Sequence, residues 1–160
     1  MSVSLGGKVV ALIGRGSDSD RAAAIACAEA GADLALATLS TDQAAEFGMN
    51  SIANEAWVLG SEQFVRIMDA TDPKAVASFV EETWARYGGC NAVVVTTVTP
   101  RIVSETFVRR MKASGGGVLV YIGEAGGRAT ELEEIASGNS VSVRRVSGET
   151  EVVAAIAGLA

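Results

Sequence analysis

The chain has 160 residues, a length that fits one domain and is enough to bury a core. Hydrophobic residues make up 49% of it and charged residues 20%, an ordinary balance for a soluble globular protein. The formal net charge of -6 argues against a nucleic-acid or anionic-membrane partner, because such partners need basic patches. The sequence contains no histidine, which removes the commonest general base and the commonest metal ligand.

Two cysteines, Cys27 and Cys90, lack the spacing of a metal site and any secretory context. We interpret both as small, reduced hydrophobic residues and expect a cytoplasmic protein. The apolar run at the N-terminus, up to Gly14, is too short for a signal peptide or a membrane span.

Strand-like and helix-like segments alternate along the chain. In chain order we expect a strand at 8–13, a helix at 21–30, a strand at 34–39, a helix from 41 to about 55, a strand at 63–68, a helix opening at 72–73, a strand at 92–95, a helix at 102–112, a strand at 118–122, a helix at 130–136, a strand at 141–146 and a helix at 151–159.

Several of these helices carry start signals. Asp72 is expected to cap the third helix, with Pro73 at its first position. Ser40 or Thr41 is expected to cap the second helix, which we expect Gly48 to interrupt. The third helix has an apolar face at spacings of three and four, formed by Val76, Phe79, Val80 and Trp84.

Strands separated by helices of this length predict a parallel sheet with right-handed crossovers and helices on both faces. We therefore expect one α/β domain over residues 1–160, a Rossmann-like, doubly wound parallel sheet.

Four segments, taken in order, resemble the short-chain dehydrogenase/reductase family. They are the strand–turn–helix–strand stretch 7–36, the stretch 68–95 with its aspartate and helix, the entry into the fifth strand at 111–123, and the closing helix 151–160. The chain is similar to a shortened, degenerate member of that family. The resemblance implies a dinucleotide-binding fold, although the residues of the usual sites are altered.

The first alteration is in the glycine turn, where active members bind the dinucleotide pyrophosphate at a helix N-terminus. Gly14 keeps the first glycine position, whereas Asp18 and Asp20 occupy the other two, and Gly16 only partly relaxes the turn. A carboxylate about 4 Å from a phosphate charge repels it by about 4 kcal/mol at an effective dielectric constant of about 20. We expect Asp18, Ser19 or Asp20 to cap the helix; a metal or unusual ligand site is the alternative.

Further cofactor positions are also altered. The second strand ends in Thr38 and Leu39, neither of which suits a ribose or a 2′-phosphate. Asp69 stands where the family's aspartate approaches adenine, although a turn residue before the next helix explains it equally well. The family's Asn-Asn-Ala-Gly stretch is replaced by Thr-Thr-Val-Thr at 96–99. We expect no cofactor.

The family's catalytic pair is a tyrosine with a lysine four residues later, preceded by a serine. The last tyrosine here is Tyr121 and the last lysine is Lys112, so nothing after the fifth strand supplies that pair. Gly123 and Glu124 stand near the place of the serine. The resemblance therefore implies a protein that is not an enzyme by itself.

We expect a non-catalytic subunit that pairs with a complete, NAD-dependent short-chain dehydrogenase. This arrangement resembles the two-subunit hydroxyacyl-CoA dehydrogenase of anaerobic toluene (benzylsuccinate) degradation, in which one short-chain subunit is non-catalytic. Core packing is an equal alternative for every one of the candidate contacts, which are Phe107, Met111, Val152, Val153 and Ile156.

Two other functions compete with this one. The loop 124–128, with two glycines before Arg128, could bind an anion as part of a small-molecule site or of a displaced reductase site, although a plain surface loop explains it as well. A receiver-like phosphoacceptor would hold Mg²⁺ on Asp18 and Asp20 near Asp69, but no lysine follows the fifth strand.

Overall fold

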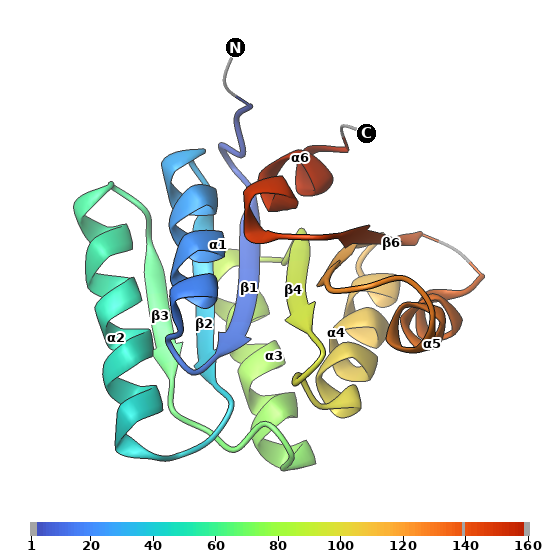
Figure 1. Ribbon diagram of the computed structural model, residues 1–160, viewed down its shortest axis with the longest axis horizontal. Helices are drawn as coiled ribbons and strands as arrows, with labels where there is room; N and C mark the ends of the chain where they lie inside the picture. Colours follow the sequence, from blue (N-terminus) through green and yellow to red (C-terminus); the bar gives the residue numbers. More distant parts are fainter. Residues whose placement is uncertain (1–2, 139, 159–160) are drawn as a thin grey trace.

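The computed structural model describes residues 3–138 and 140–158 (Figure 1). Six strands form the sheet: β1 (Val9–Gly14), β2 (Asp33–Thr38), β3 (Gln63–Arg66), β4 (Ala92–Thr96), β5 (Gly117–Ile122) and β6 (Val141–Val146). The helices are α1 (Asp18–Glu29), α2 (Gln43–Val58), α3 (Pro73–Tyr87), α4 (Arg101–Ala113), α5 (Gly127–Ala136), the 3₁₀ turn η1 (Glu149–Glu151) and α6 (Val152–Ala157).

The six strands make one sheet in the order β3-β2-β1-β4-β5-β6. Every neighbouring pair is parallel. The strand order reverses between β1 and β4, which is where doubly wound sheets open a crevice at the carboxyl ends of their strands. The expected Rossmann-like α/β fold is confirmed.

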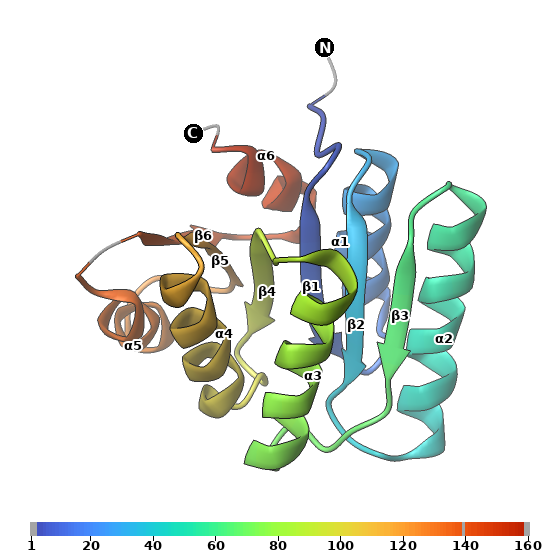
Figure 2. The same cartoon turned by 180° about the vertical axis from the view of Figure 1, so that it is seen from behind.

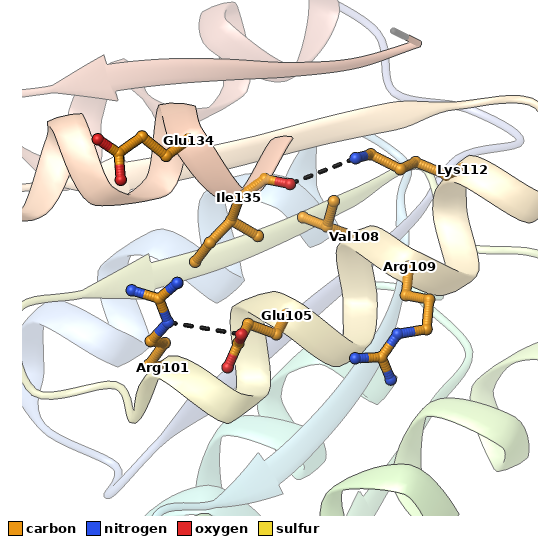
Figure 3. A pocket seen from close by; sticks show the side chains of 7 residues that line it. All are labelled: Arg101, Glu105, Val108, Arg109, Lys112, Glu134 and Ile135. Atoms are coloured by element: carbon orange, nitrogen blue, oxygen red, sulfur yellow. Dashed lines mark hydrogen bonds and ion pairs between the residues drawn. The ribbon is translucent and has the colours of Figure 1, made fainter. Parts of the chain in front are cut away.

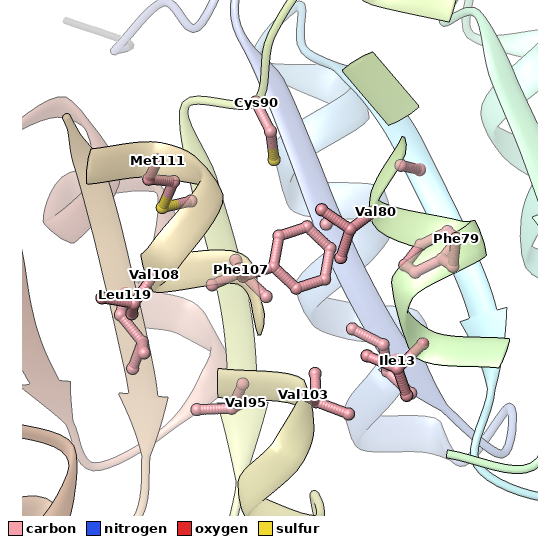
Figure 4. Close-up of a cluster of buried hydrophobic side chains, with 14 of the residues drawn as sticks. Ile13, Phe79, Val80, Cys90, Val95, Val103, Phe107, Val108, Met111 and Leu119 are labelled. Atoms are coloured by element: carbon pink, nitrogen blue, oxygen red, sulfur yellow. The ribbon is translucent and has the colours of Figure 1, made fainter. Parts of the chain in front are cut away.

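The sheet is the middle layer of three. Helices α3, α4 and α5 pack on one face and α1, α2 and α6 on the other, as Figures 1 and 2 show from opposite sides. Figure 4 shows part of the core between the sheet and the helices α3, α4 and α5. In it, Phe79 and Phe107 pack edge to face, with 5.8 Å between their ring centroids. The expected apolar face of α3 (Val76, Phe79, Val80 and Trp84) lies in this same core, which confirms it.

The start of α3 is as expected, with Asp72 as its cap and Pro73 at its first position. The second helix differs from the expectation: Asp42, rather than Ser40 or Thr41, caps α2 by accepting the N–H of Ala45 at 2.8 Å. An aspartate carboxylate at this position reaches the free N–H groups of the first turn, so it takes the capping role from its neighbours.

Gly48 does not interrupt α2, which runs without a break to Val58. Its small size serves a contact between helix and turn instead. A Cβ on Gly48 would lie 2.7 Å from the Arg15 carbonyl oxygen, and one on Gly16 would lie 2.2 Å from the Gly48 Cα. Gly16 also has a φ of +80°, which favours glycine. The two glycines therefore let α2 approach the β1–α1 turn.

The last helix is shorter than expected. Instead of a helix over 151–159, a 3₁₀ turn precedes a six-residue α6, and Leu159 lies outside the described residues. The expected strand at 63–68 ends at Arg66. Within the described ranges, no helix has the length and apolar character needed to cross a membrane.

Candidate functional site

The crevice at the carboxyl ends of the strands is formed by three connections. They are the β1–α1 turn (15–17), the β2–α2 loop (39–42) and the β4–α4 turn (97–100). Open α/β sheets place their ligands at such a switch point.

The turn after β1 is closed by Ser17 and Asp20. Ser17 caps α1, and its hydroxyl accepts the backbone N–H of Asp20 at 3.1 Å. The Asp20 carboxylate in return accepts the backbone N–H of Ser17 at 3.2 Å and that of Arg15 at 3.0 Å. The expectation that Asp18, Ser19 or Asp20 caps this helix is wrong, because Ser17 is the cap. Asp20 nevertheless satisfies free N–H groups, because this reciprocal capping box places its side chain back over the turn.

The Asp20 carboxylate lies directly against Gly14, the last residue of β1. A Cβ on Gly14 would lie 2.5 Å from Asp20 Oδ2 and 2.6 Å from its Cγ. The glycine therefore leaves room for a carboxylate of the protein itself. In glycine turns of this kind, the same backbone N–H groups are what an anionic ligand uses.

A cavity of about 480 Å³ opens beside this turn. Its walls are partly apolar, and Asp42 is its acidic residue. Hydrogen bonds from the Ser40 hydroxyl and the Ala45 N–H, with the positive charge of Arg15 nearby, lower the pKa of Asp42. The lining residues are Arg15, Leu39, Ser40, Asp42, Ala44, Ala45, Thr71, Val98 and Pro100.

The end of β2 contributes little polar chemistry to the crevice. Thr38 is fully buried, and its hydroxyl donates to the Met68 carbonyl at 2.8 Å and accepts the Met68 N–H at 2.7 Å. Leu39 lines the cavity. Sequence reasoning missed Asp42 as the acid of the crevice. The available signal was its cap-forming residue type in the short loop after the strand.

Asp69 is held in a turn. Its carboxylate accepts the hydroxyl of Thr71 at 2.7 Å and the backbone N–H of the same residue at 2.9 Å, and these bonds lower the pKa of Asp69. The interpretation of Asp69 as a turn residue is therefore the one that the contacts support.

The Thr-Thr-Val-Thr stretch closes on itself after β4. The hydroxyl of Thr99 accepts the N–H of Thr96 at 2.9 Å, and Val98 is left exposed at the cavity. Arg128 donates to the Thr99 carbonyl oxygen and pairs with Glu131 at 3.4 Å. The arginine of the loop 124–128 thus ties α5 to the β4–α4 turn.

Neither the protein-family models nor the curated proteins include a match to the chain. Among solved structures, a short-chain type dehydrogenase/reductase from Mycobacterium marinum superposes with a TM-score of 0.71 and 18% identity, over 100% of this chain and 92% of that chain. The fold is that of short-chain dehydrogenases/reductases.

Two further solved structures agree on this short-chain dehydrogenase/reductase fold. A hydroxysteroid dehydrogenase from Escherichia coli has a TM-score of 0.68 and 17% identity, over 89% of this chain and 71% of that one. A 7α-hydroxysteroid dehydrogenase, solved with NADH and 7-oxo glycochenodeoxycholic acid, has a TM-score of 0.67 and 17% identity, over 89% and 70%. At such identities the likeness concerns the fold.

The last tyrosine and the last lysine of the chain, Tyr121 and Lys112, are both engaged in contacts that hold the fold together. Tyr121, on β5, is 2% exposed and lies in the core that α3, α4 and α5 form with the sheet. Lys112 donates to the carbonyl oxygens of Ile135 at 3.3 Å and Ser137 at 3.2 Å, and so caps the end of α5. Figure 3 shows this lysine in a groove of about 280 Å³ between α4 and α5.

The candidate partner contacts need correction. Phe107 and Met111 are 0% exposed in the core against β4 and β5 (Figure 4), and Val152 and Ile156 are buried in the core of the opposite face. These four side chains are already packed within the chain, so core packing is the right interpretation for them. Val153 is only partly buried and stays a candidate contact.

The receiver-like alternative lacks its metal site. Among the residues that the structure describes, no group of three or more acidic, cysteine or histidine side chains could hold a metal ion. Asp20 and Asp69 are instead engaged with backbone N–H groups of their own turns. Cys27 and Cys90 are free and buried, as expected.

Proposed function

We propose that this chain is a non-catalytic subunit with a short-chain dehydrogenase/reductase fold, which assembles with a catalytically complete, NAD-dependent short-chain dehydrogenase and stabilises or shapes it. One observation carries the proposal. The Asp20 carboxylate binds the N–H groups of Arg15 and Ser17 and covers Gly14, at the helix N-terminus where this fold receives a pyrophosphate.

Electrostatics supports the same conclusion. A dinucleotide would have to displace Asp20 and bring its phosphates toward Asp42, whose lowered pKa keeps it ionised at neutral pH. Like charges repel, so the carboxylates of Asp20 and Asp42 oppose an incoming phosphate.

The positions of the remaining polar groups support a role without chemistry of its own. General acid catalysis needs a donor within hydrogen-bond reach of the reacting atom. Tyr121 is inside the core, and Lys112 is bonded to the end of α5. Both residues therefore contribute to the fold, and we assign the reaction to the partner.

The shape of the chain suits an assembly with a protein of the same fold. β6 is one of the two edge strands of the sheet, and edge strands are common places for a neighbouring chain to pack. Val153 is partly exposed on α6, a helix that contacts β6. We infer that the partner dehydrogenase packs at this end of the sheet.

The cavity of about 480 Å³ favours a second candidate function, a stand-alone small-molecule-binding domain. Its walls combine the apolar side chains of Leu39 and Val98 with the carboxylate of Asp42 and the guanidinium of Arg15. Such a site, with one acid and one base, suits a small neutral or zwitterionic molecule. A ligand-induced rise in melting temperature that Asp42→Asn removes would favour this function over the first.

Affinity purification from the native host tests the subunit proposal. The tagged chain should co-purify, in fixed stoichiometry, with a longer dehydrogenase that has an intact glycine turn and a Tyr-x-x-x-Lys pair. Dehydrogenase activity of the eluate should vanish when the partner's tyrosine is replaced and persist in Tyr121→Phe of this chain. A chain that purifies alone, or activity that depends on this chain's own residues, would overturn the proposal.

A further inference from the structure

A hollow of about 380 Å³ lies between the edge strand β6 and the helix α6, which contact each other (Figures 1 and 2). Its volume falls within the range of small-molecule sites, about 300–1,000 Å³. It shares no lining residue with the cavity of the crevice. We call it the β6–α6 hollow, and its lining residues are Arg144, Arg145, Val146, Thr150, Glu151, Ala154 and Ala155.

The alternation of side chains along β6 directs Arg144 into this hollow. Val141 lies in the core of the face covered by α3, α4 and α5, and Val146 lies in the core of the α6 face. Successive side chains of a strand point to opposite faces, so Arg144 shares the face of Val146. Arg145 points the other way, and its Nη1 donates to the Gly123 carbonyl oxygen at 3.0 Å. The guanidinium available to the hollow is therefore that of Arg144.

Arg144 is a partly buried cation without a counter-charge. Among the residues that the structure describes, it has neither an ion pair nor a hydrogen-bond acceptor, and its Nε is buried. Arg15 and Arg109 also lack an ion pair there, but both are exposed to water. Arg128 has a buried Nε as well, although its Nη2 donates to the Thr99 carbonyl oxygen. Because a buried charge without a partner costs free energy, Arg144 has binding capacity that the chain itself does not use.

The end of α6 offers Arg144 a competing, purely structural role. Its Nη2 lies 4.0 Å from the position that a Cβ on Gly158 would occupy, beside the last turn of the helix. The helix dipole favours a cation near a helix C-terminus. No hydrogen bond joins this guanidinium to a carbonyl oxygen within the described part of the chain, so its N–H donors stay free.

The surroundings of Arg144 define which anion fits. A guanidinium recognises the planar geometry of a carboxylate particularly well. Glu151 also lines the hollow, and its carboxylate accepts the Ser147 hydroxyl at 2.5 Å. A second negative charge on the ligand would be repelled by Glu151. The methyl groups of Ala154 and Ala155 give the hollow an apolar wall, which suits a short alkyl chain.

We propose that the β6–α6 hollow binds a small aliphatic monocarboxylate. The ligand's carboxylate pairs with the Nη atoms of Arg144, and its alkyl chain packs on Ala154 and Ala155. With one ion pair and few carbon atoms, such a ligand should bind with a dissociation constant of about 1 mM. The site needs neither the crevice nor a partner chain, so it is independent of the proposed function.

The first test measures what Arg144 does to the stability of the full chain in a buffer free of carboxylates. Arg144→Met keeps an aliphatic side chain and removes the charge, so it should raise the urea midpoint. Arg110→Met should lower it, because Arg110 pairs with Glu81 at 3.0 Å and lies over the Trp84 ring. A lower midpoint in Arg144→Met would assign Arg144 to the end of α6 and overturn the proposal.

The second test measures binding through the melting temperature, with butyrate as the probe and sodium chloride at equal ionic strength as the reference. About 100 mM butyrate should raise the melting temperature of the wild type by about 5–10 °C, and succinate should raise it less. Arg144→Met should bind butyrate about tenfold more weakly or worse. Arg109→Met removes an exposed arginine of α4 instead and should keep the full response.

Each contrary result has a definite meaning. A wild type that does not respond to butyrate would overturn the proposal. Equal responses of the wild type and Arg144→Met would show a general salt effect and would overturn it too, as would a larger response to succinate than to butyrate. These measurements use the chain without a partner, so the proposed subunit role can stand even if the carboxylate site fails.

Discussion

The carboxylate of Asp20 lies over Gly14, and a Cβ on that glycine would be 2.5 Å from Asp20 Oδ2. The same carboxylate binds the N–H groups of Arg15 and Ser17. A backbone arrangement that suits a phosphate is thus occupied by an anion of the chain itself. Asp20 stabilises the turn, and in the proposed non-catalytic role it also opposes a dinucleotide there.

Restoring the glycine pattern should therefore restore part of the nucleotide site. In the variant Asp18→Gly/Asp20→Gly, NADH should raise the melting temperature, whereas it should leave the wild type unchanged. The variant should lose about 1 kcal/mol of stability with its capping box. Asp18→Gly alone is the control, because Asp20 remains in place and no shift is expected. Equal NADH shifts in all three proteins would contradict the role of Asp20.

The contact between Gly16 and Gly48 predicts a stability effect where the sequence suggested only a weak helix. Gly48→Ala brings a Cβ to 2.7 Å from the Gly16 Cα and should lower the free energy of unfolding by about 1–3 kcal/mol, despite alanine's better helix propensity. Ser78→Ala on the exposed side of α3 should change it by less than about 0.5 kcal/mol. Urea denaturation measures both. A stabilised Gly48→Ala variant would show that helix and turn are not in contact.

The corrected place of Phe107 gives a third prediction. Phe107→Ala should cost about 3–5 kcal/mol of stability, because the ring is fully buried against Phe79 and Trp84. Val153→Ala, at a partly exposed position on α6, should cost less than about 1 kcal/mol. Thermal unfolding of the isolated chain distinguishes them. If Phe107→Ala were neutral in the isolated chain, the ring would belong to an interface after all.

The two buried thiols make the stability of the chain depend on pH. Burial raises the pKa of Cys27 and of Cys90 from 9.0 to about 12. The folded chain therefore keeps thiol protons that the unfolded chain loses above pH 9.0. The stability linked to these groups is complete below that pH and falls as the pH rises toward about 12. Alkylation at pH 8 should be slow until denaturant is added. Rapid alkylation of the native chain would contradict this burial.

Much of the fold could be predicted because its signals are local. Continuous aliphatic runs define the strands, and the apolar spacing of α3 together with Asp72 and Pro73 defines that helix. The start of α1 and the course of α2 were missed for a different reason. Ser17 and Asp42 compete with neighbours of equal capping ability, and the contact of Gly16 with Gly48 joins segments far apart in the sequence.

The candidate site was predictable only in part. The substitutions at 18 and 20 pointed to a lost nucleotide site, but which carboxylate folds back over Gly14 depends on the geometry of the capping box. The role of Phe107 could not be decided from spacing, because a core face and an interface face have the same periodicity.

Native mass spectrometry of the complex purified from its own host, under conditions that keep nucleotides bound, measures the subunit role most directly. We predict a mixed assembly whose mass accounts for this chain, a longer complete dehydrogenase, and one dinucleotide for each copy of the dehydrogenase only. An assembly without such a partner, or a dinucleotide bound for each copy of this chain, would contradict it.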